Sequence, residues 1–368
     1  MTPLTLYFGD GRPRPQTIEQ LRDCAVDLAA LQDPEFYLAG PDLRAAVTTA
    51  LLLGMPLLLT GEPGSGKSRL AASLARELGL EPVLEFVVKS DTQARDLLYR
   101  YDAVARFHAG QAEGRPADPR RFMTFTAIGR ALLYAKPPAF AADTLHLPAR
   151  PLNHPGRPQR SVVLIDEIDK APRDVPNDLL TEIEQMCFTL PELAGEGEPI
   201  PSVALTTPEE RANRPIVIIT SNSERALPEA FLRRCVYHHL EFPPFACDLG
   251  DPPPPGRITV EAICASRLGR RFPGGAGHTL LSEALSLWRY LRSPAAGLAR
   301  APSLAEALGW LAGLSPLPGQ GPQPKCLADL DPDWFLAHTR DLLFKNQPDQ
   351  ARAGDLIAQW RRVGTGAG

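Results

Sequence analysis

The segment Gly61–Ser68 reads GEPGSGKS and constrains the fold more than any other part of this sequence. It directly follows the apolar run 57–60, and Leu70, Leu74 and Leu78 come after it at helical spacing. A Gly, four residues and Gly-Lys-Ser, placed between a strand and a helix, predict a phosphate-binding P-loop. Glycines permit backbone angles that let successive N–H groups surround an anion, and the following helix adds the positive end of its dipole.

The side chains of this loop indicate which ligand it binds. Lys67 can reach the β- and γ-phosphates of a nucleotide, and the Ser68 hydroxyl can ligate Mg²⁺. We therefore expect a nucleotide and Mg²⁺ as cofactors. The predicted nucleotide-binding residues of the loop are Glu62, Pro63, Gly64, Ser65, Gly66, Lys67, Ser68 and Arg69.

Bulk properties exclude several classes of protein. The chain has 368 residues, 44% of them hydrophobic, which allows two domains and argues against disorder. The formal net charge is −4 and basic residues are scattered, so a large nucleic-acid-binding face is not suggested. The first residues lack the features of a signal peptide, and no apolar run is long enough to span a membrane. The six cysteines lie far apart, which is typical of free thiols in a reducing cytoplasm.

Five short apolar runs predict buried strands that alternate with helical stretches. Their continuous Val, Ile and Leu content is typical of a parallel sheet that is covered on both faces. The repeated strand-helix order favours an α/β fold of the P-loop NTPase class, with a five-stranded parallel sheet between helices. The P-loop then lies at the carboxyl end of the first strand, where open sheets bind ligands. The runs are 57–60, 83–88, 162–166, 216–220 and 236–242.

Changes in composition divide the chain further. A Pro-rich stretch predicts a semi-rigid linker, and four helical stretches after it predict a small all-α domain. The predicted segments are an N-terminal segment (1–30), a large α/β domain (31–245) with insertions near 102–127 and 189–214, the linker (246–257), the helical domain (258–345) and a C-terminal tail (346–368).

Two stretches between the predicted strands have local structure of their own. Asp91–Tyr101 predicts a helix, with Ser90 or Asp91 as its cap. Phe188–Arg214 contains Pro and Gly turn signals and an apolar arm, which favour a hairpin.

Two carboxylates end the strand within Ser161–Lys170, which reads SVVLIDEIDK. We expect this strand to lie beside the first strand, so that Asp166 holds Mg²⁺, mostly through its water shell. Glu167 is then placed to polarise the water that attacks the γ-phosphate. A solvated acidic strand end is the alternative interpretation. The added Glu favours hydrolysis over a small-molecule kinase or a Ras-like GTPase.

Two further candidates follow along the chain. The strand within Pro215–Asn222 ends in Asn222, whose amide could bond the γ-phosphate or the attacking water, although such an Asn is more often a turn residue. Leu227–Cys235 predicts a short helix with Arg233 and Arg234 at its end. An exposed Arg can neutralise charge in the transition state, whereas the alternative is a charge pair that complements the helix dipole.

The four segments GEPGSGKS, LIDEID, IITSN and LPEAFLRRC, in this order and spacing, resemble an AAA+ ATPase, and most closely the MoxR group. FYLAG before the first strand, the two insertions and LPEA before the arginines add to the resemblance, which covers about residues 30–245. It implies a large α/β ATPase domain, a small helical lid and a homo-oligomeric ring, usually a hexamer, with ATP between subunits.

The resemblance also implies roles for single residues. Lys67 and Ser68 match the Walker A pair, Asp166 and Glu167 match the Walker B pair, and Asn222 matches the sensor 1 position. These matches assign Glu167 and Asn222 to catalysis, and Ser68 and Asp166 to the metal.

The remaining roles follow from the same resemblance. Tyr37 and Leu38 match the segment that lies against the adenine. Arg234 is the better match for the arginine that enters the neighbouring subunit's site, and Arg233 stays open as the alternative. The third lid helix has no arginine at its start, where relatives offer one to the γ-phosphate; Arg300 lies just before it and could take that place.

We interpret the chain as a cytoplasmic MoxR-like AAA+ ATPase that hydrolyses ATP in a ring to remodel, assemble or activate a partner protein. The resemblance implies a client with a von Willebrand factor A domain. The alternatives are a nucleotide-gated scaffold with little turnover and a nucleic-acid-associated motor of a bacterial defence system. Glu167, Asn222 and the two arginines together argue against the scaffold. The negative net charge argues against the nucleic-acid-associated motor.

Overall fold

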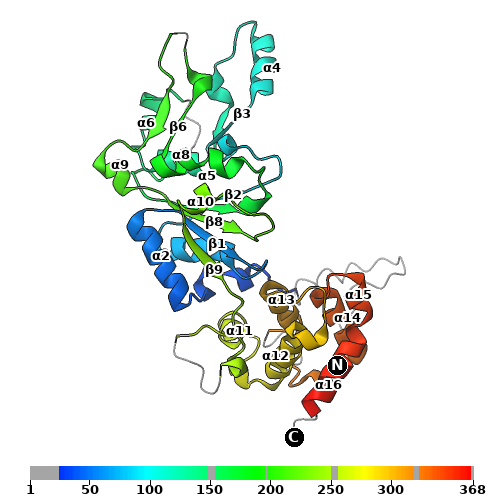
Figure 1. Ribbon diagram of the computed structural model, residues 1–368. Helices are drawn as coiled ribbons and strands as arrows, with labels where there is room; N and C mark the ends of the chain where they lie inside the picture. Colours follow the sequence, from blue (N-terminus) through cyan, green and yellow to red (C-terminus); the bar gives the residue numbers. More distant parts are fainter. Residues whose placement is uncertain (1–24, 148–153, 196, 250–255, 318–322, 366–368) are drawn as a thin grey trace. The chain divides into compact units, whose positions relative to one another are not determined.

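The computed structural model describes residues 25–147, 154–195, 197–249, 256–317 and 323–365 (Figure 1). The chain divides into two compact units, one made of 1–40, 62–66 and 242–368 and the other of 41–61 and 67–241. Most of the predicted N-terminal segment, part of the predicted linker and the glycine-rich end of the predicted tail lie outside the described residues.

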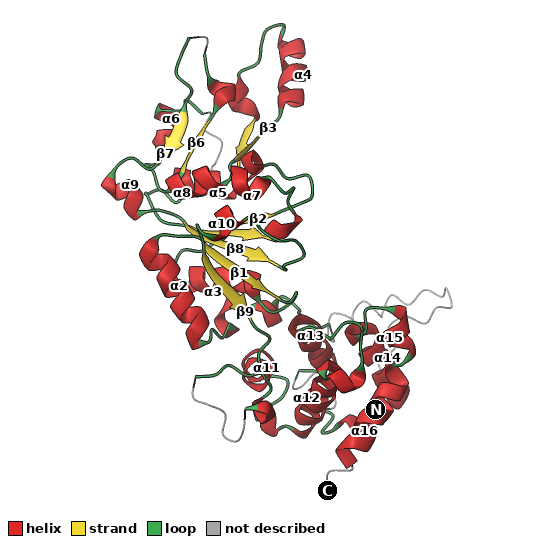
Figure 2. Ribbon diagram, viewed as in Figure 1, coloured by secondary structure: helices red, strands yellow, loops and turns green. Residues whose placement is uncertain are grey.

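A five-stranded parallel sheet forms the centre of the second unit, in the order β2-β5-β8-β1-β9 (Figure 2). The predicted α/β fold with a five-stranded parallel sheet is therefore confirmed. Every residue of β1 is buried, as expected for a strand covered on both faces. The strands are β1 (Leu57–Gly61), β2 (Leu84–Val87), β5 (Val162–Asp166), β8 (Ile216–Ser221) and β9 (Val236–Leu240).

The strand order corrects one expectation. The acidic strand β5 does not lie beside β1, because β8 pairs with both and separates them. Two strand spacings of about 4.8 Å separate β1 from β5, a distance about equal to the 10 Å width of one helix. The helix α3 (Lys67–Leu78) packs on β1, β8 and β5, so its first turn still meets the end of β5.

Helices cover both faces of this sheet. In Figure 2, α2 and α3 lie on one side of it, and α5, α7 and α8 lie on the other. The remaining helices of the unit are α2 (Pro41–Leu53), α4 (Ala103–Glu113), α5 (Ala127–Tyr134), α6 (Phe140–Asp143), α7 (Val175–Asp178), α8 (Leu180–Gln185), α9 (Pro208–Ala212) and α10 (Glu229–Leu232).

The helix predicted over Asp91–Tyr101 is wrong. Only one 3₁₀ turn forms there, Ala94–Leu97, and the chain then enters β3 (Tyr99–Tyr101), which pairs antiparallel with β4 (Met123–Phe125). Burial of the Tyr99 ring in this pair outweighs the local helical signal, because side-chain packing decides strand formation more than intrinsic preference does.

The two insertions pack against each other. The predicted hairpin is present as β6 (Cys187–Thr189) and β7 (Ser202–Ala204), paired antiparallel. The ring centroids of Tyr99 and Phe188 lie 5.9 Å apart, and those of Phe125 and Phe188 lie 6.3 Å apart. Both small sheets therefore share one three-ring cluster, made of Tyr99, Phe125 and Phe188.

The other unit is helical around its own core. Trp288 and Trp310 are fully buried in it, and Phe242 and Phe245 pack edge-on against Trp288. The predicted C-terminal tail includes two helices, and Leu356 is fully buried among them. Its helices within the described residues are α11 (Val260–Leu268), α12 (Thr279–Arg292), α13 (Leu304–Leu314), α14 (Pro332–Leu343), α15 (Gln347–Ala351) and α16 (Ala353–Thr365).

Gly61 ends β1 at a place where no side chain fits. Its φ is +144°, and a Cβ there would lie 2.4 Å from the carbonyl oxygen of Leu240 in β9. Only glycine allows this close approach between the start of the P-loop and the edge strand.

Candidate active site

The first turn of α3 carries the two polar side chains that follow the P-loop glycines. Lys67 is buried, and its Nζ donates a hydrogen bond of 2.8 Å to the carbonyl oxygen of Gly61. Half-buried Ser68 donates from Oγ to Oδ1 of Asp166 over 2.7 Å. A hydroxyl and a carboxylate thus meet at the carboxyl edge of the sheet.

Thr220 of β8 joins this pair to the neighbouring catalytic candidate. Its hydroxyl donates to Oδ1 of Asp166 over 2.5 Å and accepts from the backbone N–H of Glu167 over 3.0 Å. Because β8 pairs with β5, a side chain near the end of β8 can reach both acidic residues at the end of β5. Thr220 was not among the predicted site residues; its position two residues before Asn222 is the signal that could have identified it.

Asp169 fixes the loop that carries Asn222. It is buried, and its Oδ2 accepts from the backbone N–H groups of Asn222 (3.1 Å) and Glu224 (3.0 Å). A buried carboxylate is costly unless it is hydrogen-bonded, and two backbone donors provide that here. Sequence reasoning missed Asp169 too, although it is the second acidic residue after the β5 strand.

Glu167 is held from two sides. Its Oε2 lies 2.5 Å from Nζ of Lys170, and its Oε1 accepts from Nδ2 of Asn222 over 3.4 Å. The hydrogen bond to Glu167 raises the pKa of Lys170 above its ordinary value. Glu167 has a φ of +61°, a left-handed backbone conformation that is costly for residues other than glycine. Residues held in such conformations are often found at active sites.

The P-loop residues 62–66 belong to the helical unit, where they meet other predicted positions. A Cβ on Gly66, whose φ is +96°, would lie 3.5 Å from the Tyr37 ring. Burial raises the pKa of the Tyr37 hydroxyl above its ordinary value. Leu38, beside it, is half-buried, and the loop's Pro63 and Gly64 are exposed.

Two arginines of this unit lie near the start of α13 or near the P-loop. Arg300 pairs with Glu306 of α13 at 3.3 Å. Arg292, at the end of α12, lies 3.1 Å from Glu62 of the P-loop and was not predicted. It also covers the Phe242 ring at 3.4 Å. Arg292 was difficult to find in the sequence because it precedes the helix start at which such an arginine is sought.

The residues present fit a nucleotide with Mg²⁺. Oγ of Ser65 is buried and has no hydrogen-bond partner within the described part of the chain, so this P-loop hydroxyl is available to a ligand. The oxygens of Ser68 and Asp166 are the hard donors that Mg²⁺ prefers.

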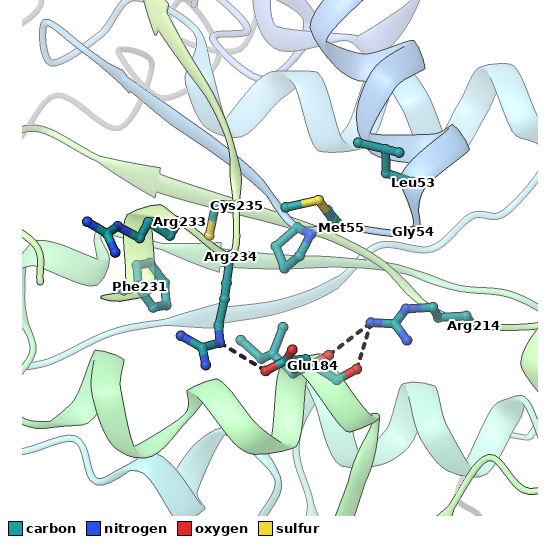
Figure 3. Close-up of a pocket in the computed structure, with 11 residues that line it drawn as sticks. Leu53, Gly54, Met55, Glu184, Arg214, Phe231, Arg233, Arg234 and Cys235 are labelled. Carbon is teal, nitrogen blue, oxygen red and sulfur yellow. Dashed lines mark hydrogen bonds and ion pairs between the residues drawn. The ribbon is translucent and has the colours of Figure 1, made fainter. Parts of the chain in front are cut away.

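Arg233 and Arg234 lie at the opposite edge of the same sheet. They line a cavity of about 350 Å³ together with residues that precede β1, β8 and β9 (Figure 3). Nε of Arg234 lies 2.9 Å from Oε2 of Glu184, while Arg233 pairs with Glu229 on its own helix. A strand of five residues spans about 16 Å, longer than an arginine side chain. Neither arginine therefore reaches Lys67 or Ser68 of its own chain.

Residues 56–235 match the model of the AAA domain, dynein-related subfamily, which supports an AAA+ ATPase. A similar solved structure, described as a putative ATPase from Cytophaga hutchinsonii, is 13% identical and has a TM-score of 0.33. The alignment covers 94% of this chain and 95% of that one. No curated protein matches the chain. Within the described residues, no helix has the length and apolar content needed to cross a bilayer.

Proposed function

We propose that this chain is a MoxR-like AAA+ ATPase that hydrolyses ATP at the subunit interfaces of a ring, and that it uses this cycle to remodel, assemble or activate a client protein. The observation that carries the proposal is the separation of its polar groups. Lys67, Ser68 and Asp166 meet at the carboxyl edge of the sheet, whereas Arg234 lies at the amino edge. A second copy would have to supply the arginine.

Each residue at the carboxyl edge has a task in this proposal. Lys67 would bind the β- and γ-phosphates, and Ser68 and Asp166 would hold Mg²⁺, which would neutralise phosphate charge. Glu167 would accept a proton from the attacking water, and Asn222 would orient that water or the γ-phosphate. Asn222 contacts the Glu167 carboxylate, so both side chains would be able to contact the same water molecule.

Arg234 would stabilise the negative charge that develops on the neighbour's γ-phosphate. An arginine supplied in this way contributes about 10³–10⁵-fold to the rate of related enzymes. The likeness in motif order to the MoxR group supports a partner with a von Willebrand factor A domain.

Mixed rings test the proposal. The ATPase rate is measured against protein concentration for the wild type, Glu167→Gln, Arg234→Ala, Arg233→Ala and an equimolar mixture of Glu167→Gln with Arg234→Ala. We expect a steep rise of the wild-type rate with concentration. Glu167→Gln and Arg234→Ala should each turn over at least about 10³-fold more slowly than the wild type, and their mixture should recover part of the rate.

The alternative outcomes are distinct. If the rate does not depend on concentration and the mixture recovers nothing, each chain works alone or the chain is a scaffold with little turnover. If Arg233→Ala is inactive and Arg234→Ala is not, the two arginines exchange roles.

A further inference from the structure

The cavity at the amino edge contains a carboxylate that the proposed chemistry does not use. Glu184, in the last turn of α8, lies against Arg234, with 2.9 Å between Oε2 and Nε (Figure 3). The carbonyl oxygen of Ala230 accepts a second hydrogen bond, from Nη1 of Arg234, over 3.2 Å. The guanidinium is therefore held by two elements, α8 and α10.

These two bonds leave the outer part of the guanidinium available. An arginine has five N–H donors in a rigid planar fork. Glu184 occupies the Nε–H and Ala230 occupies one N–H of Nη1, whereas Nη2 has no acceptor within the described residues. A phosphate can therefore bind Arg234 without displacing Glu184.

The neighbouring arginine is held differently. Arg233 uses its Nη2 to pair with Glu229, four residues earlier on the same helix, and both side chains are about three-quarters exposed. In Figure 3, Arg233 points away from Glu184, while Arg234 points toward it. Only Arg234 is fixed from a second element of the unit.

A third arginine fixes the turn that carries Glu184. Nη2 of Arg214 donates to the carbonyl oxygens of Ile183 (3.2 Å) and Glu184 (3.1 Å), the unpaired carbonyls at the end of α8. A cation at a helix carboxyl end also complements the helix dipole. Arg214 thus holds the main chain from which Glu184 reaches Arg234.

We infer that Glu184 is a positioning residue for Arg234: it orients the guanidinium for the neighbour's nucleotide before two subunits meet. This inference rests on the proposed function, in which Arg234 acts in trans. Its physical basis is that a catalytic group held in place in advance needs no reorganisation when the reaction occurs. Glu184 acts through Arg234 and contacts no reacting atom itself.

The test is a double-mutant cycle on the full-length chain, with ATPase kinetics of Glu184→Gln, Glu184→Ala, Arg234→Ala and the double variant Glu184→Ala/Arg234→Ala. We expect Glu184→Ala to lower kcat about 10-fold, since a misplaced group costs up to about 100-fold. Glu184→Gln keeps an oxygen acceptor and should lose less. The KM for ATP should stay unchanged, because Glu184 lies at the edge opposite Lys67. The double variant should be no slower than Arg234→Ala alone.

Glu229→Gln is the matched control, because it removes the carboxylate from the other arginine; its kcat should equal that of the wild type. If Arg234→Ala abolishes turnover while Glu184→Ala retains the wild-type kcat, Glu184 does not position Arg234. An additional loss in the double variant beyond Arg234→Ala would also overturn the inference. Full activity of Arg234→Ala would instead overturn the role that the proposed function gives to Arg234, and the inference with it.

Discussion

At the carboxyl edge of the central sheet, charged residues are buried or half-buried and joined by consecutive hydrogen bonds, whereas at the amino edge they mostly form single exposed pairs. Asp166 accepts from both Ser68 and Thr220, and Thr220 in turn accepts from Glu167. By contrast, the side chains of Arg234 and Glu184 are 45% and 60% exposed. Removing one residue from a buried hydrogen-bond network leaves its partners unsatisfied, which is costly. An exposed ion pair contributes only about 0–1 kcal/mol to the free energy of unfolding.

The difference matches the tasks proposed for the two edges. The carboxyl edge would hold a nucleotide and a metal ion within its own chain, so its groups are fixed by one another. The amino edge would present an arginine to another subunit, so its groups must stay accessible. Each of the following predictions tests one part of this contrast, from the largest expected effect to the smallest.

Asp166→Asn should cause the largest loss, at least about 100-fold in ATPase rate, as for removal of one group that stabilises transition-state charge. The amide keeps the shape of the side chain but loses the charge that would hold Mg²⁺. The rate is measured as a function of Mg²⁺ concentration, and the variant should need more of it. Glu85→Gln, an exposed change on β2 of the same sheet, is the control. An unchanged rate and Mg²⁺ dependence would contradict the role given to Asp166.

Acid should weaken a buried ion pair of the α/β unit. Lys136 and Glu210 lie 2.9 Å apart with 4% and 11% of their side chains exposed. Burial alone raises the pKa of Glu210, but the bonds from Lys136, Thr206 and Thr207 outweigh it and lower the pKa to about 2.

Because this pKa is lowered on folding, the stabilisation is complete above about pH 4.5 and is lost as the pH falls toward 2. The shift corresponds to up to about 3 kcal/mol in the free energy of unfolding. Denaturant unfolding at pH 7, 4 and 3 should show a smaller pH dependence for Glu210→Gln than for the wild type. Equal pH dependence in both proteins would show that Glu210 does not cause the loss of stability in acid.

Asp169→Ala should lower the free energy of unfolding by about 2 kcal/mol, because it leaves the N–H groups of Asn222 and Glu224 without their acceptor. It should also lower the ATPase rate, since Asn222 loses its anchor. Thermal unfolding and turnover are measured together. Loss of stability without loss of rate would separate Asp169 from the active site.

Glu229→Gln should have the smallest effect, below about 0.5 kcal/mol in the free energy of unfolding. Its pair with Arg233 joins residues four apart on one exposed helix. Denaturant unfolding in low and high salt checks this. A loss above 1 kcal/mol would mean that the Glu229–Arg233 pair stabilises the fold more than an exposed ion pair normally does.

The sequence allowed the sheet and the main polar residues to be predicted because their signals are local. Buried parallel strands are continuously apolar, and the polar residue after each one marks the carboxyl edge, as at Asp166 and Asn222. Thr220 and Asp169 could not be predicted because each has its role through hydrogen bonds to a strand or loop that is distant in the sequence. The order of β5 and β8 was equally inaccessible, since both strands are apolar on both faces.

Tertiary contacts account for the other differences. Tyr99 lies in a segment with helical signals, yet its ring is buried beside Phe125 and Phe188 and the segment becomes a strand. Arg292 approaches Glu62 only because a helix from a distant part of the sequence ends there. No local pattern encodes either contact.

The three-ring cluster makes the two insertions a single unit for protein engineering. Phe125 belongs to the first insertion and packs on Phe188, which directly precedes the second. Glu192 of the second insertion accepts hydrogen bonds from the Tyr99 hydroxyl and from Arg95, which precede the first. A truncation that removes one insertion would expose the aromatic rings that pack against it. The resulting apolar patch would be prone to aggregation. A minimal ATPase cut from this chain should therefore keep both insertions or replace both together.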